Sequence, residues 1–96
     1  MNVVLSKNAE DHLDAIYAHI SRDSDDLAGK VLARIKRRAE QIALFPTSGR
    51  IVPELGFPQI REVFEHPYRI MYVISAENIE ILAVLHEAMD SFSENL

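Results

Sequence analysis

The segment PTSGRIVPELGFP, residues 46–58, divides the chain into two parts with different hydrophobic periods. It contains three of the four prolines and two of the three glycines, a composition typical of an ordered loop. Before it, apolar residues recur at the spacing of an α-helix, and after it they alternate as in a β-strand. The sequence therefore predicts an α+β order.

Two amphipathic helices are predicted before this loop. Ser6 is placed to cap a helix over about residues 7–21, and Ser24 to cap a second helix that ends before Pro46. Acidic residues follow both caps, where the helix dipole favours negative charge. Because the break between the helices is short, we expect an antiparallel pair. Their apolar positions are Ala9, Leu13, Ile16, Tyr17 and Ile20, then Ala28, Val31, Leu32, Ile35, Ala39, Ile42 and Phe45.

Strands are predicted on both sides of the helical pair. One short strand covers residues 3–5, and three more cover 60–65, 68–74 and 79–85. The predicted order is β-α-α-β-β-β, a helical hairpin packed on a twisted antiparallel sheet whose last three strands form a meander. With 96 residues and no linker or repeat, the chain is expected to form a single domain over residues 1–96. The last ten residues, EAMDSFSENL, are expected to fray or to form a short helix.

Composition limits the classes of function. The chain has no cysteine, which excludes disulfides, thiolate catalysis and cysteine-ligated zinc. His12, His19 and His66 match no metal-ligand spacing, and the glycines match no phosphate-binding fingerprint, so we expect neither metal nor cofactor. No run approaches the roughly 20 apolar residues of a membrane span, and the N-terminus does not read as a signal peptide. A cytoplasmic protein is expected.

Charge is unevenly distributed along the chain. The net charge of −5 argues against direct binding of nucleic acid, because phosphate binding rests on a basic surface. Residues 27–50, however, carry six basic groups and one acidic group. The basic band in this segment is either a solvated helix face or a surface that binds an acidic partner. Its members are Lys30, Arg34, Arg37 and Arg38.

Arg69 places a charge inside a predicted strand, HPYRIMYVI (66–74). Alternation puts it on one face of the sheet with Met71. Two helices cover only one face of a small sheet, so we expect the face with Arg69 to be partly open. Arg69 then either forms an ion pair with Glu62 or Glu65, or is a surface guanidinium that binds phosphate or carboxylate.

His86 ends the last predicted strand. Strict alternation places it in register with Glu80, Leu82 and Val84. It is either a strand-end histidine bonded to backbone or a general base, because imidazole titrates near neutral pH. We expect it to share the uncovered face with Arg69.

Three segments of the chain, FPTSGRIVPEL (45–55), IREVFEHPYRIMYVI (60–74) and IEILAVLHEAMD (79–90), resemble the RelE/ParE superfamily of bacterial toxins from type II toxin–antitoxin modules. The resemblance covers nearly the whole chain and rests on the order and spacing of its motifs. It is closer to the ParE branch, associated with poisoning DNA gyrase, than to the RelE branch, which cuts messenger RNA on the ribosome. The most specific motifs are Phe45-Pro46, Gly49-Arg50, Pro53-Glu54-Leu55, Arg61-Glu62, Tyr68-Arg69-Ile70 with Tyr72, and Leu85-His86.

The resemblance implies a partner. A cognate ParD-like antitoxin would wrap the toxin with an extended or helical tail, laying apolar side chains over exposed apolar surface. Acidic antitoxin side chains would meet the basic band or Arg50. A tail that folds on binding is disordered when free, which explains labile neutralisation.

The resemblance also implies two alternative activities. The ParE-like prediction is a non-enzymatic inhibitor of DNA gyrase, associated with plasmid stabilisation, with Arg69, Arg61 and His86 as surface contacts. The RelE-like alternative is a ribosome-dependent endoribonuclease, in which His86 moves protons, Arg69 holds phosphate, and Arg61 and Glu54 complete the site.

The sequence departs from the superfamily pattern after the last strand. Relatives often carry arginine or tyrosine there, whereas this chain has Glu87 and Met89, and its last aromatic residue is Phe92. An acidic residue beside His86 would repel phosphate, which weakens the endoribonuclease hypothesis. A third hypothesis is a module that binds its antitoxin but has lost toxicity.

Overall fold

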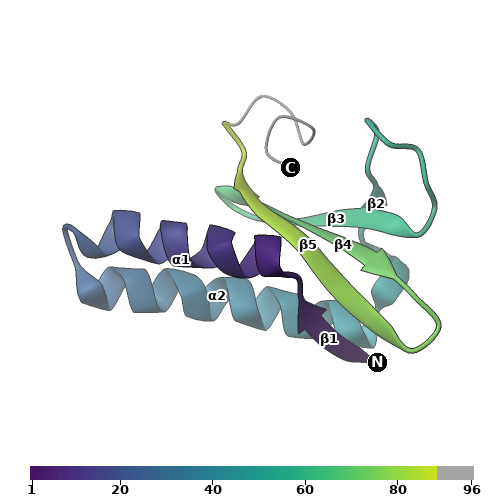
Figure 1. Ribbon diagram of the computed structural model, residues 1–96, viewed down its shortest axis with the longest axis horizontal. Coiled ribbons are helices and arrows are strands. Elements are labelled where there is room, and N and C mark those ends of the chain that lie inside the picture. The colour runs from purple at the N-terminus through teal and green to yellow at the C-terminus, as the bar shows by residue number, and fades with distance from the viewer. Residues whose placement is uncertain (89–96) are drawn as a thin grey trace.

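Two α-helices and a five-stranded sheet make up residues 1–88, the part of the chain that the structure, a computed structural model, describes (Figure 1). In chain order the elements are β1 (Asn2–Leu5), α1 (Lys7–Ser21), α2 (Asp25–Leu44), the 3-10 helix η1 (Pro46–Ser48), β2 (Arg50–Ile51), β3 (Ile60–Glu65), β4 (Tyr68–Ile74) and β5 (Asn78–His86). The predicted α+β fold is confirmed. Most of the segment EAMDSFSENL lies outside the described residues.

Both helices begin at the predicted serine caps. The hydroxyl of Ser6 accepts a hydrogen bond from the Ala9 amide, and that of Ser24 from the Leu27 amide, each at 3.0 Å. Each cap pairs one of the amides that a helix start leaves without an intrahelical partner. The end of α2 differs from the prediction. Phe45, expected as the last apolar position, lies beyond the helix and is 67% exposed, because Pro46 starts a new element.

The strand order is β1-β5-β4-β3-β2. All neighbours pair antiparallel except β1 and β5, which are parallel, where the sequence predicted an antiparallel sheet. Strands joined by a tight turn must be antiparallel, but β1 and β5 lie at opposite ends of the described chain and no turn constrains them. The short edge strand β2 was predicted as loop.

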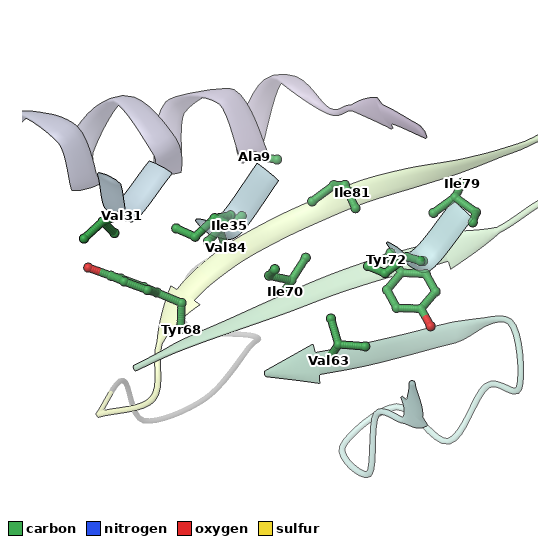
Figure 2. Packing of buried hydrophobic residues seen from close by; sticks show 11 residues of the cluster. Ala9, Val31, Ile35, Val63, Tyr68, Ile70, Tyr72, Ile79, Ile81 and Val84 are labelled. Carbon is green, nitrogen blue, oxygen red and sulfur yellow. The ribbon is translucent and has the colours of Figure 1, made fainter. Parts of the chain in front are cut away.

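The helices lie against one face of the sheet, which we define as the inner face (Figure 1). This face carries the main core. Figure 2 shows Val31 and Ile35 of α2 above side chains from β3, β4 and β5. The strand residues of this cluster are Val63, Tyr68, Ile70, Tyr72, Ile79, Ile81 and Val84. Burying one large apolar side chain stabilises a fold by about 1.5–3 kcal/mol. Together these side chains make a large contribution to the stability of the protein.

The outer face is covered as well, contrary to expectation. Val52 and Leu55, in the segment between β2 and β3, pack against Met71, Ala83 and Leu85, and all of these except Leu55 are fully buried. The segment of residues 52–59, which we call the strap, lies over the outer face as a third partial layer. We expected a partly open face with Arg69 on it, whereas the strap covers the part that holds Met71 and Arg69; the prediction counted only helices as possible cover.

No helix among residues 1–88 is long and apolar enough to cross a bilayer.

Candidate functional site

Glu62 is the centre of an ion cluster on the outer face. Its side chain is 0% exposed. Arg50 Nε donates to Oε2, while Arg69 donates to Oε1 through Nε at 3.0 Å and Nη2 at 2.6 Å. Arg69 Nη2 also reaches Glu54 Oε2, in the strap, at 3.3 Å. The strand register produces this arrangement, because Arg50 lies opposite Glu62 and Arg69 lies one diagonal step away on β4.

Arg69 is therefore held by its own chain. Its side chain is 12% exposed and faces two carboxylates. Burial alone lowers the pKa of Arg69, but hydrogen bonds and charge from Glu62 and Glu54 outweigh it and raise the pKa. Of the two interpretations from sequence, the structure has the ion pair, with Glu62 and not with Glu65. A guanidinium neutralised in this way has little capacity left for a phosphate group.

Arg50 is the exposed member of the cluster. Its side chain is 60% exposed, and its guanidinium carbon lies 5.4 Å from the centre of the Phe64 ring. This is a cation–π contact, which adds to the ion pair with Glu62. Arg50 is thus the one arginine of the cluster with a face open to a partner.

Arg61 lies on the inner side of the sheet, opposite Tyr72. Its guanidinium donates to three backbone carbonyls, those of Pro58 at 3.0 Å, Gly49 at 3.0 Å and Thr47 at 3.3 Å. These bonds join the strap to the segment that follows α2. Arg61 therefore fixes the position of the strap relative to the segment that follows α2.

His86 lies on the inner face, and not with Arg69. Leu82 is an extra residue in β5: Met71 pairs with Ala83, while Tyr72 pairs with Ile81. This bulge reverses the alternation for the rest of the strand. His86 consequently pairs with Tyr68, its ring meeting that of Tyr68 edge-on at 5.7 Å, and the prediction of a shared face was wrong.

A groove of about 330 Å³ lies between α1 and β5. Three histidines, His12, His19 and His86, line it. His12 Nδ1 accepts a hydrogen bond from the Val84 amide at 3.1 Å, and burial lowers the pKa of His12. His86 Nδ1 accepts from the Ala88 amide, also at 3.1 Å. Among residues 1–88, no three His, Cys, Asp or Glu side chains form a possible metal site. Of the three histidines, His12 and His86 thus each hold a backbone amide.

The basic band of α2 starts with two paired residues. Lys30 contacts Asp26 at 3.0 Å within the helix, an exposed pair. Arg34 reaches Glu65 at 3.4 Å and donates to the His66 carbonyl at 2.7 Å, so it fastens α2 to the turn between β3 and β4. Such exposed pairs add little stability.

The second half of the band has no carboxylate partner in the described chain. Arg38 donates to the side-chain oxygen of Gln41 at 3.2 Å, a neutral group. Arg37 is exposed and has no salt bridge within residues 1–88. Positive charge is thus uncompensated at this point of α2.

An apolar groove of about 480 Å³ lies on the other side of α2, between that helix and β1. Beside it, β1 pairs only with β5 in the described sheet, so its outer edge is free, and Leu5 is 43% exposed. Most of the lining residues were predicted as apolar helix or strand positions, but periodicity does not show how far a helix stands from an edge strand. The lining is Val3, Leu5, Leu13, Leu32, Ile35, Lys36, Ala39, Glu40, Ile70, Ile81 and Val84.

The predicted site residues do not form one site. Arg69 and Arg50 share the outer face, Arg61 and His86 lie on the inner side, and the basic band runs along α2. Glu62, predicted as a possible partner of Arg69 and as part of the Arg61-Glu62 motif, organises a compact charged cluster within the described residues. The signal available was an acidic strand residue whose neighbours on the same face, Ile60 and Phe64, are apolar.

Comparisons with known proteins agree with this architecture. The family model described as "ParE toxin of type II toxin-antitoxin system, parDE" matches residues 3–91. "Putative toxin Y4kP" of Sinorhizobium fredii (strain NBRC 101917 / NGR234) is 40% identical over 76 residues, covering 77% of this chain and 75% of that protein. A solved structure described as "Chromosomal ParDE TA system from P. aeruginosa" superposes with a TM-score of 0.74 at 22% identity, covering 90% of this chain and 95% of that one.

Proposed function

The chain belongs to the family of ParE toxins of type II toxin–antitoxin systems, and from this premise we propose that it stops growth by binding DNA gyrase. The inhibition requires no bond-making chemistry by the toxin. A protein–protein inhibitor needs exposed contact surfaces, and the basic band and Arg50 offer them.

The observation that carries this proposal is the separation of the candidate catalytic groups. Cleavage of RNA at a 2′-hydroxyl needs a base, a cation and an acid within hydrogen-bond reach of one phosphate. Here Arg69 is neutralised on the outer face, while Arg61 and His86 lie on the inner side. This arrangement favours an inhibitor over the endoribonuclease alternative.

We further propose that a ParD-like antitoxin silences the toxin at the apolar groove. An extended segment can add to the free edge of β1 through backbone hydrogen bonds, as in other cases of strand addition. Apolar side chains of the same segment would then fill the groove beside α2. Because gyrase and such an antitoxin act in the cytoplasm, the toxin acts there too, and a plasmid that encodes the pair is stabilised.

The test is to induce the chain alone and with its antitoxin. Gyrase poisoning predicts growth arrest with induction of the DNA-damage response, while transcripts remain intact. Translation arrest with cuts at codons in the ribosomal A site would instead establish the endoribonuclease. Normal growth under full induction, with antitoxin binding retained, would show a module that has lost toxicity.

A further inference from the structure

One flank of α2 combines basic side chains with exposed apolar ones. We call it the basic flank and define it by Lys30, Arg34, Arg37, Arg38, Gln41, Leu44 and Phe45. Within the helix, Arg37 and Arg38 are adjacent and the other steps are of three or four residues, so all these positions lie along one side. Phe45 follows directly after the last turn.

The basic flank and the apolar groove are on opposite sides of α2. Arg34 reaches Glu65 at the end of β3, whereas Lys36 and Ala39 line the groove beside β1. In the sheet, β1 and β3 are separated by β5 and β4. A single extended segment seated in the groove therefore does not reach the basic flank without crossing over the helix.

The charge of the basic flank is only partly compensated. Lys30 and Arg34 each have a carboxylate neighbour, but Arg37 and Arg38 have none among residues 1–88. The whole chain carries a net charge of −5, so this local positive surface stands against an acidic background. Such a surface attracts an acidic partner and fixes its orientation.

The side chains at the apolar end of the basic flank are mostly exposed to solvent. Leu44 is 72% exposed and Phe45 is 67% exposed, more than any other large apolar residue of the described chain. Leu44 lies two turns after Arg37 on the same side of the helix. Arginine and aromatic side chains side by side are typical of the residues that dominate protein–protein binding energy.

We propose that the basic flank is the surface by which the toxin grips its target, and that the target meets it with an acidic protein segment carrying an apolar side chain. This inference rests on the proposed function and adds the location of the toxic contact. Protein is favoured over nucleic acid because two uncompensated arginines on a chain of net charge −5 make a poor phosphate-binding surface. It follows that toxicity and neutralisation use different sides of α2.

Two neighbouring charge reversals test the proposal. Arg37→Glu changes the basic flank, and Lys36→Glu changes the groove side of the same helix by the same charge. Neither residue has a salt bridge within residues 1–88, so both variants are expected to keep the melting temperature of the wild type. The binding probe is purified DNA gyrase at low and high salt, and the cellular readout is growth after induction.

Arg37→Glu should weaken gyrase binding at least about tenfold and relieve growth arrest, while Lys36→Glu retains both. Phe45→Ala should weaken binding without changing its salt dependence. Equal binding and toxicity in Arg37→Glu and Lys36→Glu would overturn the proposal. The proposal would also be overturned if the Arg37→Glu variant stayed toxic but no longer bound the antitoxin. It would fail too if Arg37 of the wild-type chain proved to contact duplex DNA and not protein.

Failure of the proposed function gives different results. A wild-type chain that does not arrest growth ends both the proposed function and this inference. A wild-type chain that arrests growth without binding gyrase refutes the gyrase target alone. In that case the comparison of Arg37→Glu with Lys36→Glu in cells still decides whether the basic flank is the toxic surface.

Discussion

Glu62 illustrates how one residue can decide the role of its neighbours. Its buried carboxylate binds Arg50 and Arg69 together, so neither arginine can be interpreted without it. A buried charge that loses its partner costs several kcal/mol, whereas an exposed partner contributes far less. The stability of the outer face should therefore depend unequally on the two arginines.

Arg69→Ala is expected to lower the free energy of unfolding by about 3 kcal/mol, because it leaves Glu62 buried with a single partner. Arg50→Ala, which removes the partner that is 60% exposed, should cost about 1 kcal/mol. Urea unfolding of both variants measures the difference. Equal losses of unfolding free energy in the two variants, or an Arg69→Ala variant as stable as the wild type, would contradict the idea that the buried partner of Glu62 contributes more than the exposed one.

Two glycines should respond in opposite directions to alanine. At Gly29, inside α2, an added Cβ meets nothing within 4 Å, so Gly29→Ala should stabilise the protein by about 0.5–1 kcal/mol. At Gly49 the same atom would lie 2.5 Å from Tyr72 Oη and 2.7 Å from the Glu62 carbonyl oxygen. Gly49→Ala should therefore cost about 1–3 kcal/mol. Thermal melts of the pair provide the comparison, and a shift of the same sign in both would contradict it.

At the scale of the elements, α1 is tied to β5 by the hydrogen bond from the Val84 amide to His12. Protonated imidazole has no free acceptor, so the bond requires neutral His12. The pKa of His12 is lowered from its ordinary value of 6.5 by burial, although the charge of Asp11 acts the other way. A group with a lowered pKa in the folded state stabilises the fold above its unfolded pKa and loses that contribution as the pH falls.

The free energy of unfolding should thus decline as the pH drops below about 6.5. His12→Asn, which keeps an acceptor near Nδ1 but does not titrate, should remove this part of the decline. His19→Asn alters the same groove without touching the Val84 bond and serves as the control. Chemical unfolding at several pH values measures the free energy of unfolding as a function of pH. If this free energy declined in parallel for wild type and His12→Asn, His12 would not be the group responsible.

Elements with strong local signals were predictable from sequence. Both helices begin where Ser6 and Ser24 predict, because capping is a property of a few adjacent residues. The bulge at Leu82, the pairing of β1 with β5 and the cover given by Leu55 were not predictable. Each depends on contacts between segments far apart in the chain, which periodicity does not encode.

At the scale of the whole molecule, the same limit explains the site. The sequence predicted Arg69 and His86 on one face, but they lie on opposite faces of the sheet. It placed the basic band on the second helix but could not say that the apolar groove lies on the other flank of that helix. Surfaces are formed by several elements together, so their composition follows only from the assembled fold.

The free edge of β1 offers a matched test of where the antitoxin binds. Leu5 and Val4 are adjacent and similarly exposed, at 43% and 42%, but Leu5 lines the groove while Val4 pairs with Glu80 on the outer face. Leu5→Asp should abolish rescue by the antitoxin and leave toxicity intact, whereas Val4→Asp should retain both. Growth under co-expression measures this, and loss of rescue by Val4→Asp alone would place the antitoxin on the outer face.

The extra residue in β5 gives that strand one position that it can lose. Removing the codon for Leu82 would join Ile81 to Ala83, whose partners Tyr72 and Met71 are already adjacent in β4, so the residues of β5 would keep their present faces. The His86 imidazole would still lie opposite Tyr68, and the aliphatic side chain of Val84 would stay in the main core. Removing the codon for Ile70 from β4, which has no extra residue, would turn part of that strand over, so of these two deletions only the one at Ile70 should yield insoluble protein.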